Sequence, residues 1–178
     1  MMKNNRELQY VKGDLIKLAL QKKFDVITHG CNCFCRMGSG IAVPMKNHFG
    51  CDMFPLEKQE YRCDYNKLGQ IDYKPFKLDN TTMEETEFVD ASGKSHTLWV
   101  VNSYTQYAPG QPTEPYGVPL DYDALKMCFR KINRKFSGSH LGIPKIGSGL
   151  AGGNWNRIET IIKNETPNMN VTVVEYEK

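Results

Sequence analysis

DVITHGCNCFCRMGSGIAVPMKNHF, residues 25–49, is the stretch that decides the fold of this chain. It opens on a short apolar run, Val26-Ile27-Thr28, which predicts a buried parallel strand. A loop with glycines at 30, 38 and 40 follows, and from Ile41 the apolar residues recur at helical spacing. Strand, glycine loop and helix together can bind phosphate, because glycines let the backbone approach an anion and the helix start presents unpaired N–H groups. A single loop of this kind does not separate a phosphate site from an ordinary turn.

A second loop of the same kind lies near the other end of the chain, in HLGIPKIGSGLAGGNW, residues 140–155. His140–Ile143 predicts a short strand, and a helix is expected from Trp155 to Asn164 with Asn154 as its N-cap. Two such loops predict one crevice that holds two phosphates or one diphosphate. Neither loop has the Gly-Lys-Ser/Thr of the Walker motif or a clean G-x-G-x-x-G. A conventional nucleoside triphosphatase or dehydrogenase is therefore not expected.

The other segments alternate between strand and helix patterns. Further strands are expected at 8–11, 96–103 and 169–175, and further helices at 15–22 and 120–136. The alternation predicts a three-layer α/β/α sandwich with a mixed, largely parallel central sheet. In such sheets, ligands bind beyond the carboxyl ends of the strands.

Three segments interrupt this alternation. Residues 66–95 predict an edge hairpin, in which Pro75 confines the strand 71–78 to an edge. Residues 107–119 hold four prolines and two glycines and predict a long loop. Pro55 is expected in the first turn of a helix running to about Tyr65. Residues 1–178 are expected to form one domain.

The composition excludes several functional classes. The net charge of +3 is mild, so it favours an anionic small molecule but gives no strong nucleic-acid signal. No apolar run approaches the roughly 18 residues of a membrane span, and MMKNNRELQY lacks the apolar core of a signal peptide. A cytoplasmic protein without membrane contact is expected.

Six cysteines lie at positions 31, 33, 35, 51, 63 and 128. The C-x-C-x-C run is not a common zinc motif, and no second cluster completes a ligand set. Buried reduced thiols, with their three side chains on one side of the loop, are the first interpretation, with a metal site or a redox pair as alternatives. No metal and no cofactor are expected.

Taken together, these pieces resemble the macro domain family, the ADP-ribose-binding α/β/α modules. The resemblance runs through most of the chain, in LQYVKGDLI, FDVITHGCNCFCRMGSGIAVPMK, WVVNSYTQ, LGIPKIGSGLAGGNW and VTVVEY. It is closest to the branch of ADP-ribose 1''-phosphate phosphatases and terminal ADP-ribose glycohydrolases. That branch carries H-x-C-N or H-C-x-S where other macro domains carry N-A-A-N.

The resemblance implies a role for each matching position. Asp14 would accept a hydrogen bond from the adenine amino group, and the backbone of Leu15 and Ile16 would read the ring edge. Asp14 as a helix N-cap is the alternative, and both can hold. Tyr176 would pack near adenine or close the core as an edge aromatic.

The distal half of ADP-ribose would lie in the glycine loops. Asn32 would contact the distal ribose and orient an attacking water, unless it is simply a turn residue. The resemblance gives two loops of ligand-binding residues. The first would surround the distal ribose and one phosphate and consists of Gly38, Ser39, Gly40 and Ile41. The second would surround the diphosphate and consists of Gly147, Ser148, Gly149, Leu150 and Ala151.

His29 occupies a position where most macro domains have asparagine. An imidazole titrates near neutrality, so it can move a proton during hydrolysis. The alternative is a hydrogen-bonded structural histidine. The glycohydrolases of this branch use a lysine and an aspartate where this chain has Gln106 and Ala151, which argues against their lysine-adduct mechanism.

Three functions therefore remain open. The first is hydrolysis of ADP-ribose 1''-phosphate to ADP-ribose and phosphate, with His29 and Asn32 as catalytic residues. The second is a reader that binds free or protein-linked ADP-ribose without chemistry. The third is a glycohydrolase that removes ADP-ribose from protein or nucleic acid.

Overall fold

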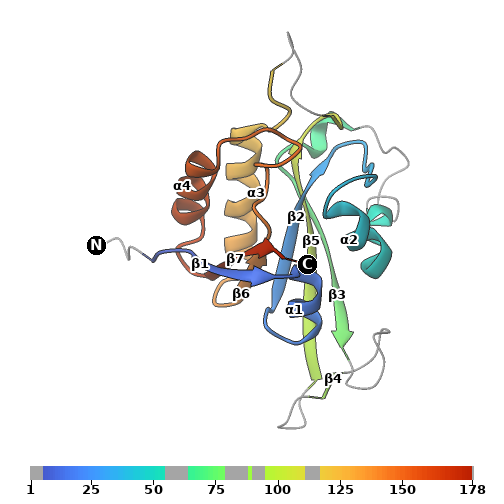
Figure 1. The fold of residues 1–178 in the computed structure, drawn as a ribbon, viewed down its shortest axis with the longest axis vertical. Helices are drawn as coiled ribbons and strands as arrows, with labels where there is room; N and C mark the ends of the chain where they lie inside the picture. The colour runs from blue at the N-terminus through green and yellow to red at the C-terminus, as the bar shows by residue number, and fades with distance from the viewer. Residues whose placement is uncertain (1–5, 55–63, 79–87, 90–94, 111–116, 178) are drawn as a thin grey trace.

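A seven-stranded mixed sheet with helices on both faces forms the framework (Figure 1). The computed structural model describes residues 6–54, 64–78, 88–89, 95–110 and 117–177. The strands, in chain order, are β1 (Gln9–Gly13), β2 (Val26–Asn32), β3 (Ile71–Leu78), β4 (Phe88–Val89), β5 (Ser95–Gln106), β6 (His140–Ile143) and β7 (Asn170–Tyr176). The helices are α1 (Leu15–Leu20), α2 (Ala42–Phe49), α3 (Tyr122–Lys135) and α4 (Trp155–Glu165), with 3₁₀ helices η1 (Cys51–Met53) and η3 (Tyr65–Lys67).

The strand order is β1-β7-β6-β2-β5-β3, and β4 pairs with β5 beside this path. The pairs β1–β7, β7–β6, β6–β2 and β2–β5 are parallel, whereas β3 and β4 run antiparallel to β5. Five parallel strands therefore end at the same edge of the sheet, where α/β proteins place their ligands. The three-layer α/β/α sandwich expected from the sequence is confirmed.

Two apolar cores fill the space between the sheet and its helices. One core lies under α1 and α2 and includes Leu15, Met45 and Phe49, and the other lies under α3 and α4 and includes Phe129 and Ile158. Burying such side chains contributes about 1.5–3 kcal/mol each, which fixes the helices against the sheet.

Helix boundaries differ slightly from the sequence expectations, for local reasons. The first helix stops at Leu20 because Lys22 takes a left-handed backbone, with φ of 62°. The α3 helix begins at Tyr122 because the Asp121 side chain caps it by accepting from the Ala124 N–H at 2.9 Å. Asn154 caps α4 as expected, through the Arg157 N–H.

The segments that break the alternation are described in part. Pro75 sits in β3, which is the last strand at one edge of the sheet, and both β3 and β4 pair with β5. Residues 79–87, 90–94 and 111–116 of the expected hairpin and loop lie outside the described residues. The helix expected from Pro55 falls largely on residues 55–63, which also lie outside them.

Candidate functional site

A cleft of about 620 Å³ opens at the carboxyl edge of the parallel strands. Its walls are the loop between β2 and α2, the loop between β6 and α4, and the end of β5. The lining residues are Gly30, Asn32, Arg36, Gly38, Ser39, Gly40, Ile41, Ala42, Thr105, Gln106, Pro109, Gly110, Pro144, Lys145, Ile146, Gly147, Gly149, Leu150 and Ala151. The structure therefore brings together the two glycine loops that lie more than a hundred residues apart in the sequence.

The first loop lines the cleft and has backbone donors without an acceptor within the described residues. Helix α2 starts after Ile41 without a side-chain cap. Within the described residues, the N–H groups of positions 38–42 donate to no protein acceptor. A helix start with free N–H groups carries partial positive charge. This end of α2 can therefore bind an anion.

The second loop faces the first and is built the same way. Gly147 has a left-handed backbone, with φ of 76°, and its carbonyl accepts from the Gly153 N–H at 2.8 Å, which closes the loop on itself. In the described part of the chain, the N–H groups of Gly149, Leu150 and Ala151 are left without acceptors. Of the predicted loop residues, Ser148 is the one outside the lining; its hydroxyl donates to the Lys145 carbonyl at 2.8 Å.

Asn32 lines the cleft, but its side chain is already engaged. Its Oδ1 accepts from the Arg36 N–H at 3.1 Å, and its Nδ2 donates to the Arg36 carbonyl at 2.9 Å. These two bonds fold residues 32–36 into a tight loop, in which Cys35 takes a φ of 54°. In this arrangement the Asn32 amide shapes the loop, and its side chain would have to give up a bond to contact a ribose.

Two basic residues that the sequence reasoning did not single out also line the cleft. The Arg36 guanidinium lies 5.6 Å from the centre of the Phe34 ring, and within the described residues it forms no ion pair. Lys145 is paired with Glu175 at 3.0 Å on a half-exposed surface. Both residues lie beside glycines, in C-R-M-G-S-G and P-K-I-G-S-G, and this was the signal in the sequence that pointed to a position near the cleft.

His29 lies in the core under α2 and does not line the cleft. It is fully buried, and its Nε2 is 2.9 Å from Asn102 Oδ1, 3.5 Å from Cys31 Sγ and 3.6 Å from Cys51 Sγ. Burial lowers the pKa of this imidazole to about 4, despite the opposing effect of the Asn102 hydrogen bond. A neutral, enclosed histidine fits the structural alternative better than the catalytic one.

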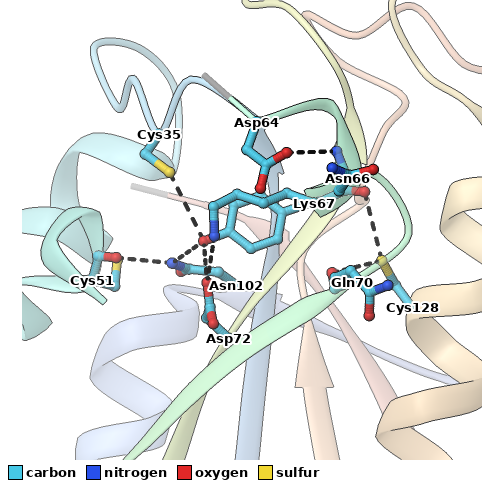
Figure 2. A network of polar contacts seen from close by, with 10 residues as sticks. Cys35, Cys51, Asp64, Asn66, Lys67, Gln70, Asp72, Asn102 and Cys128 are labelled. Carbon is cyan, nitrogen blue, oxygen red and sulfur yellow. Dashed lines mark hydrogen bonds and ion pairs between the residues drawn. The ribbon is translucent and has the colours of Figure 1, made fainter. Parts of the chain in front are cut away.

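The contacts of His29 continue into a buried polar network (Figure 2). Asn102 Nδ2 donates to the Cys51 carbonyl at 2.8 Å, which ties β5 to the start of η1. The Tyr104 hydroxyl donates to Asp72 Oδ2 at 2.8 Å, and the same oxygen accepts a hydrogen bond from Lys67 Nζ at 3.4 Å. Desolvation raises the pKa of the Tyr104 phenol well above its usual value, so it remains a donor.

The cysteines form no disulfide among the described residues. Cys31, Cys33 and Cys35 all lie in the core under α1 and α2, as the alternation of the C-x-C-x-C run predicted. Burial raises the pKa of the Cys33 thiol to about 11 and that of Cys51 to about 12, so both stay protonated. No group of side chains in the described part of the chain could hold a metal ion.

The residues expected at adenine lie at the same sheet edge but outside the lining of the cleft. Asp14 caps α1, because its Oδ1 accepts from the Ile16 N–H at 2.9 Å and the Lys17 N–H at 3.1 Å. The Ile16 N–H is therefore already used, and the side chains of Leu15 and Ile16 are buried in the core. Tyr176, which is 72% exposed, pairs in register with Gly13 next to Asp14.

Among the helices in the described part of the chain, none is both long enough and apolar enough to cross a bilayer.

The chain is similar to known proteins over nearly its full length. No protein-family model matches. The chain is 30% identical over 174 residues to the uncharacterised 17.5 kDa protein of the tk-vs intergenic region of Enterobacteria phage T4, covering 96% of this chain and 97% of that protein.

Solved structures extend the comparison to the fold. The macrodomain of Mycobacterium tuberculosis DarG superimposes with a TM-score of 0.59 at 18% identity, over 94% of this chain and 96% of that one. Thermosipho africanus DarTG, solved in complex with ADP-ribose, gives a TM-score of 0.61 at 16% identity, over 96% of this chain and 43% of that one. At these identities the likeness concerns the fold.

Proposed function

The chain belongs to the family that includes the 17.5 kDa protein of phage T4 and has the macrodomain fold, and from this premise we propose that its cleft binds ADP-ribose. The observation that carries the proposal is the pair of glycine loops, which line one cleft and whose N–H groups at positions 38–42 and 149–151 have no acceptor within the described residues. A pyrophosphate presents acceptor oxygens on two adjoining phosphates, so it can satisfy both rows of donors at once. The complex of Thermosipho africanus DarTG with ADP-ribose supports the same ligand, because that protein shares the fold.

The strands that the loops follow determine which end of ADP-ribose would lie at which end of the cleft. Asp14 and Tyr176 lie at the ends of β1 and β7, on one side of the second loop in the sheet order. Asn32 and Arg36 follow β2, nearer the other edge. The adenosine half would therefore lie toward Asp14, whose second carboxylate oxygen has no hydrogen-bond partner within the described residues, and the distal ribose toward Arg36.

Hydrolysis of ADP-ribose 1''-phosphate is a second candidate. Arg36 favours it, because a cation that forms no ion pair within the described residues would complement a third phosphate at the distal end of the cleft. His29 would not supply the proton transfer, since it is buried away from the cleft. Removal of ADP-ribose from a macromolecule is the third candidate. Binding without chemistry is the function that needs the fewest side chains, because it requires no catalytic group.

The experiment is a calorimetric titration with ADP-ribose, with AMP and ribose 5-phosphate as controls for each half of the ligand. We expect ADP-ribose to bind more tightly than either half, because only it carries the full pyrophosphate. Incubation with ADP-ribose 1''-phosphate then measures released phosphate. Binding without phosphate release would leave the reader function and the removal of ADP-ribose from a macromolecule, and equal weak binding of all three ligands would overturn the proposal.

A further inference from the structure

Three buried hydroxyl side chains lie on the neighbouring strands β2 and β5: Thr28 on β2, and Ser103 and Thr105 on β5. Thr28 donates to the Val101 carbonyl at 2.9 Å, so Ser103 is the donor in the 2.7 Å hydrogen bond between the Thr28 and Ser103 hydroxyls. These two side chains therefore have partners. The Thr105 hydroxyl has none within the described residues, although Thr105 is only 1% exposed.

The Thr105 hydroxyl opens into the cleft between the two glycine loops. Thr105 lines this cleft, and in the described part of the chain no fully enclosed side-chain oxygen or nitrogen lacks a partner. The hydroxyl is therefore in contact with the cleft and is not sealed in the core. Since a hydroxyl in such a place costs free energy until it is hydrogen-bonded, a ligand that supplies the bond is favoured. The sequence alone did not single out this residue.

The backbone of β5 fixes the place of this hydroxyl. The pairing of β2 with β5 passes from Cys31 and Tyr104 directly to Asn32 and Gln106, so Thr105 lies opposite no residue of β2. A bulge of this kind changes the direction of the extra side chain and is common beside functional sites. The position of the Thr105 hydroxyl is therefore built into the sheet edge, where the ligand would lie.

Gly30 leaves room beside the same hydroxyl. A Cβ on Gly30 would lie 3.1 Å from Thr105 Oγ1 and 3.3 Å from Ile146 Cγ1. The backbone of Gly30 has no positive φ, so its conformation does not require glycine. The absent side chain keeps the space around the Thr105 hydroxyl open.

The place of Thr105 in the sheet indicates which part of the ligand meets it. In the strand order β6-β2-β5, Thr105 lies on the far side of β2 from the second glycine loop, which is the side of the distal ribose in the orientation proposed above. We infer that the Thr105 hydroxyl hydrogen-bonds a hydroxyl of the distal ribose and thereby selects ADP-ribose over ADP. Backbone N–H groups only donate, which suits phosphate oxygens, whereas a ribose hydroxyl also needs an acceptor, and the Thr105 oxygen supplies one.

This inference rests on the proposed function and names a specificity-determining residue of the same cleft. The test is a calorimetric titration of native protein and of Thr105→Val with ADP-ribose and with ADP, which lacks the distal ribose. We expect Thr105→Val to bind ADP-ribose about 5- to 150-fold more weakly, because a ribose hydroxyl is left without its partner. ADP should bind both proteins equally. Thr105→Ser keeps the hydroxyl and should bind ADP-ribose within about 3-fold of the native affinity.

The controls separate a ligand contact from a structural role. Thr105→Val should unfold at the native temperature, because its hydroxyl has no partner to lose among the described residues; a lower unfolding midpoint would contradict the inference. Thr160→Val removes an exposed hydroxyl that donates to the Asn156 carbonyl at 3.0 Å within α4, away from the cleft, and should bind both ligands as the native protein does.

Two outcomes would overturn the inference while leaving the proposed function in place. Equal losses for ADP-ribose and ADP in Thr105→Val would put the hydroxyl at the pyrophosphate, and native ADP-ribose affinity in this variant would remove Thr105 from the contacts. Failure of the native protein to bind ADP-ribose would overturn the proposed function and this inference with it.

Discussion

Gly40 and Leu150 face each other across the cleft: a Cβ placed on Gly40 would lie 3.8 Å from Leu150 Cδ1. One residue belongs to the loop before α2 and the other to the loop before α4. The two glycine loops therefore approach each other at this point, and a side chain added to Gly40 would narrow the cleft that both of them line.

Gly149→Val should abolish ADP-ribose binding without harming the fold. A Cβ at Gly149 meets no protein atom within 4 Å, and the backbone there does not have a positive φ, so valine fits the free protein. It would, however, occupy the space of the phosphates. Calorimetry should show no binding, and the thermal unfolding midpoint should stay unchanged.

The matched control for this variant is Gly153→Ala. A Cβ at Gly153 would lie 2.3 Å from Leu120 Cδ2 and 2.7 Å from the Gly147 carbonyl oxygen, so this variant should unfold at a lower temperature. If folded Gly149→Val binds ADP-ribose with native affinity, the second loop does not hold the phosphates.

Asp14→Ser should separate the two roles of Asp14. Serine caps a helix about as well as aspartate, so α1 should keep its stability, whereas Asp14→Ala should lower the free energy of unfolding by about 1 kcal/mol. Serine cannot reach an adenine amino group as a charged acceptor. We therefore expect ADP-ribose to bind Asp14→Ser more weakly by about 1.5–3 kcal/mol.

The inosine analogue of ADP-ribose is the control ligand, because its base lacks the amino donor. It should bind native protein and Asp14→Ser almost equally. Equal losses for both ligands would mean that Asp14 serves only as the cap of α1.

The sequence predicted the fold well because periodicity and capping are local signals. Asp14 before an apolar helix, and two strand–glycine–helix units, sufficed to place the cleft at one edge of the sheet. Side-chain direction was harder to predict. Alternation along β2 puts His29 on the same face as Ile27 and Cys31, but which face is covered by α2 depends on the tertiary packing.

The backbone conformation of the loop after β2 was harder still to predict from the sequence. The inward turn of Asn32 toward Arg36 depends on the left-handed Cys35, and nothing in a C-x-C-x-C run predicts a positive φ at its last cysteine. For the same reason, the place of Arg36 beside glycines was a signal in the sequence, but its position in the lining of the cleft depends on this turn.

His29→Gln should remove a component of the pH dependence of stability and leave ADP-ribose binding intact. Folding lowers the pKa of His29 from 6.5 to about 4, so the unfolded chain binds more protons in this interval. The contribution of His29 to stability is therefore present above pH 6.5 and is lost as the pH falls toward 4. Its slope is at most about 1.4 kcal/mol per pH unit.

The measurement is the free energy of unfolding from urea titrations at several pH values. Since carboxylates titrate in the same range, the readout is the difference between native protein and variant. A difference that does not change with pH would contradict a neutral buried imidazole. Phosphate release that depends on His29 at native ADP-ribose affinity would restore its catalytic role.

Asn32→Ala should loosen the loop that forms the distal wall of the cleft. Native Asn32 makes two hydrogen bonds to the backbone of Arg36, at 3.1 and 2.9 Å, and alanine leaves both backbone groups without that partner. We expect a loss of about 1–3 kcal/mol in the free energy of unfolding and faster hydrogen exchange at the Arg36 amide. ADP-ribose should bind more weakly to the variant. Its loop is less ordered in the free protein, so binding must also order the loop that lines the cleft. A residue that only contacts a ribose hydroxyl would lower affinity without changing amide exchange in the free protein. Native exchange at Arg36 in Asn32→Ala would therefore show that the loop holds its shape without this side chain, and that any loss of binding comes from a direct contact.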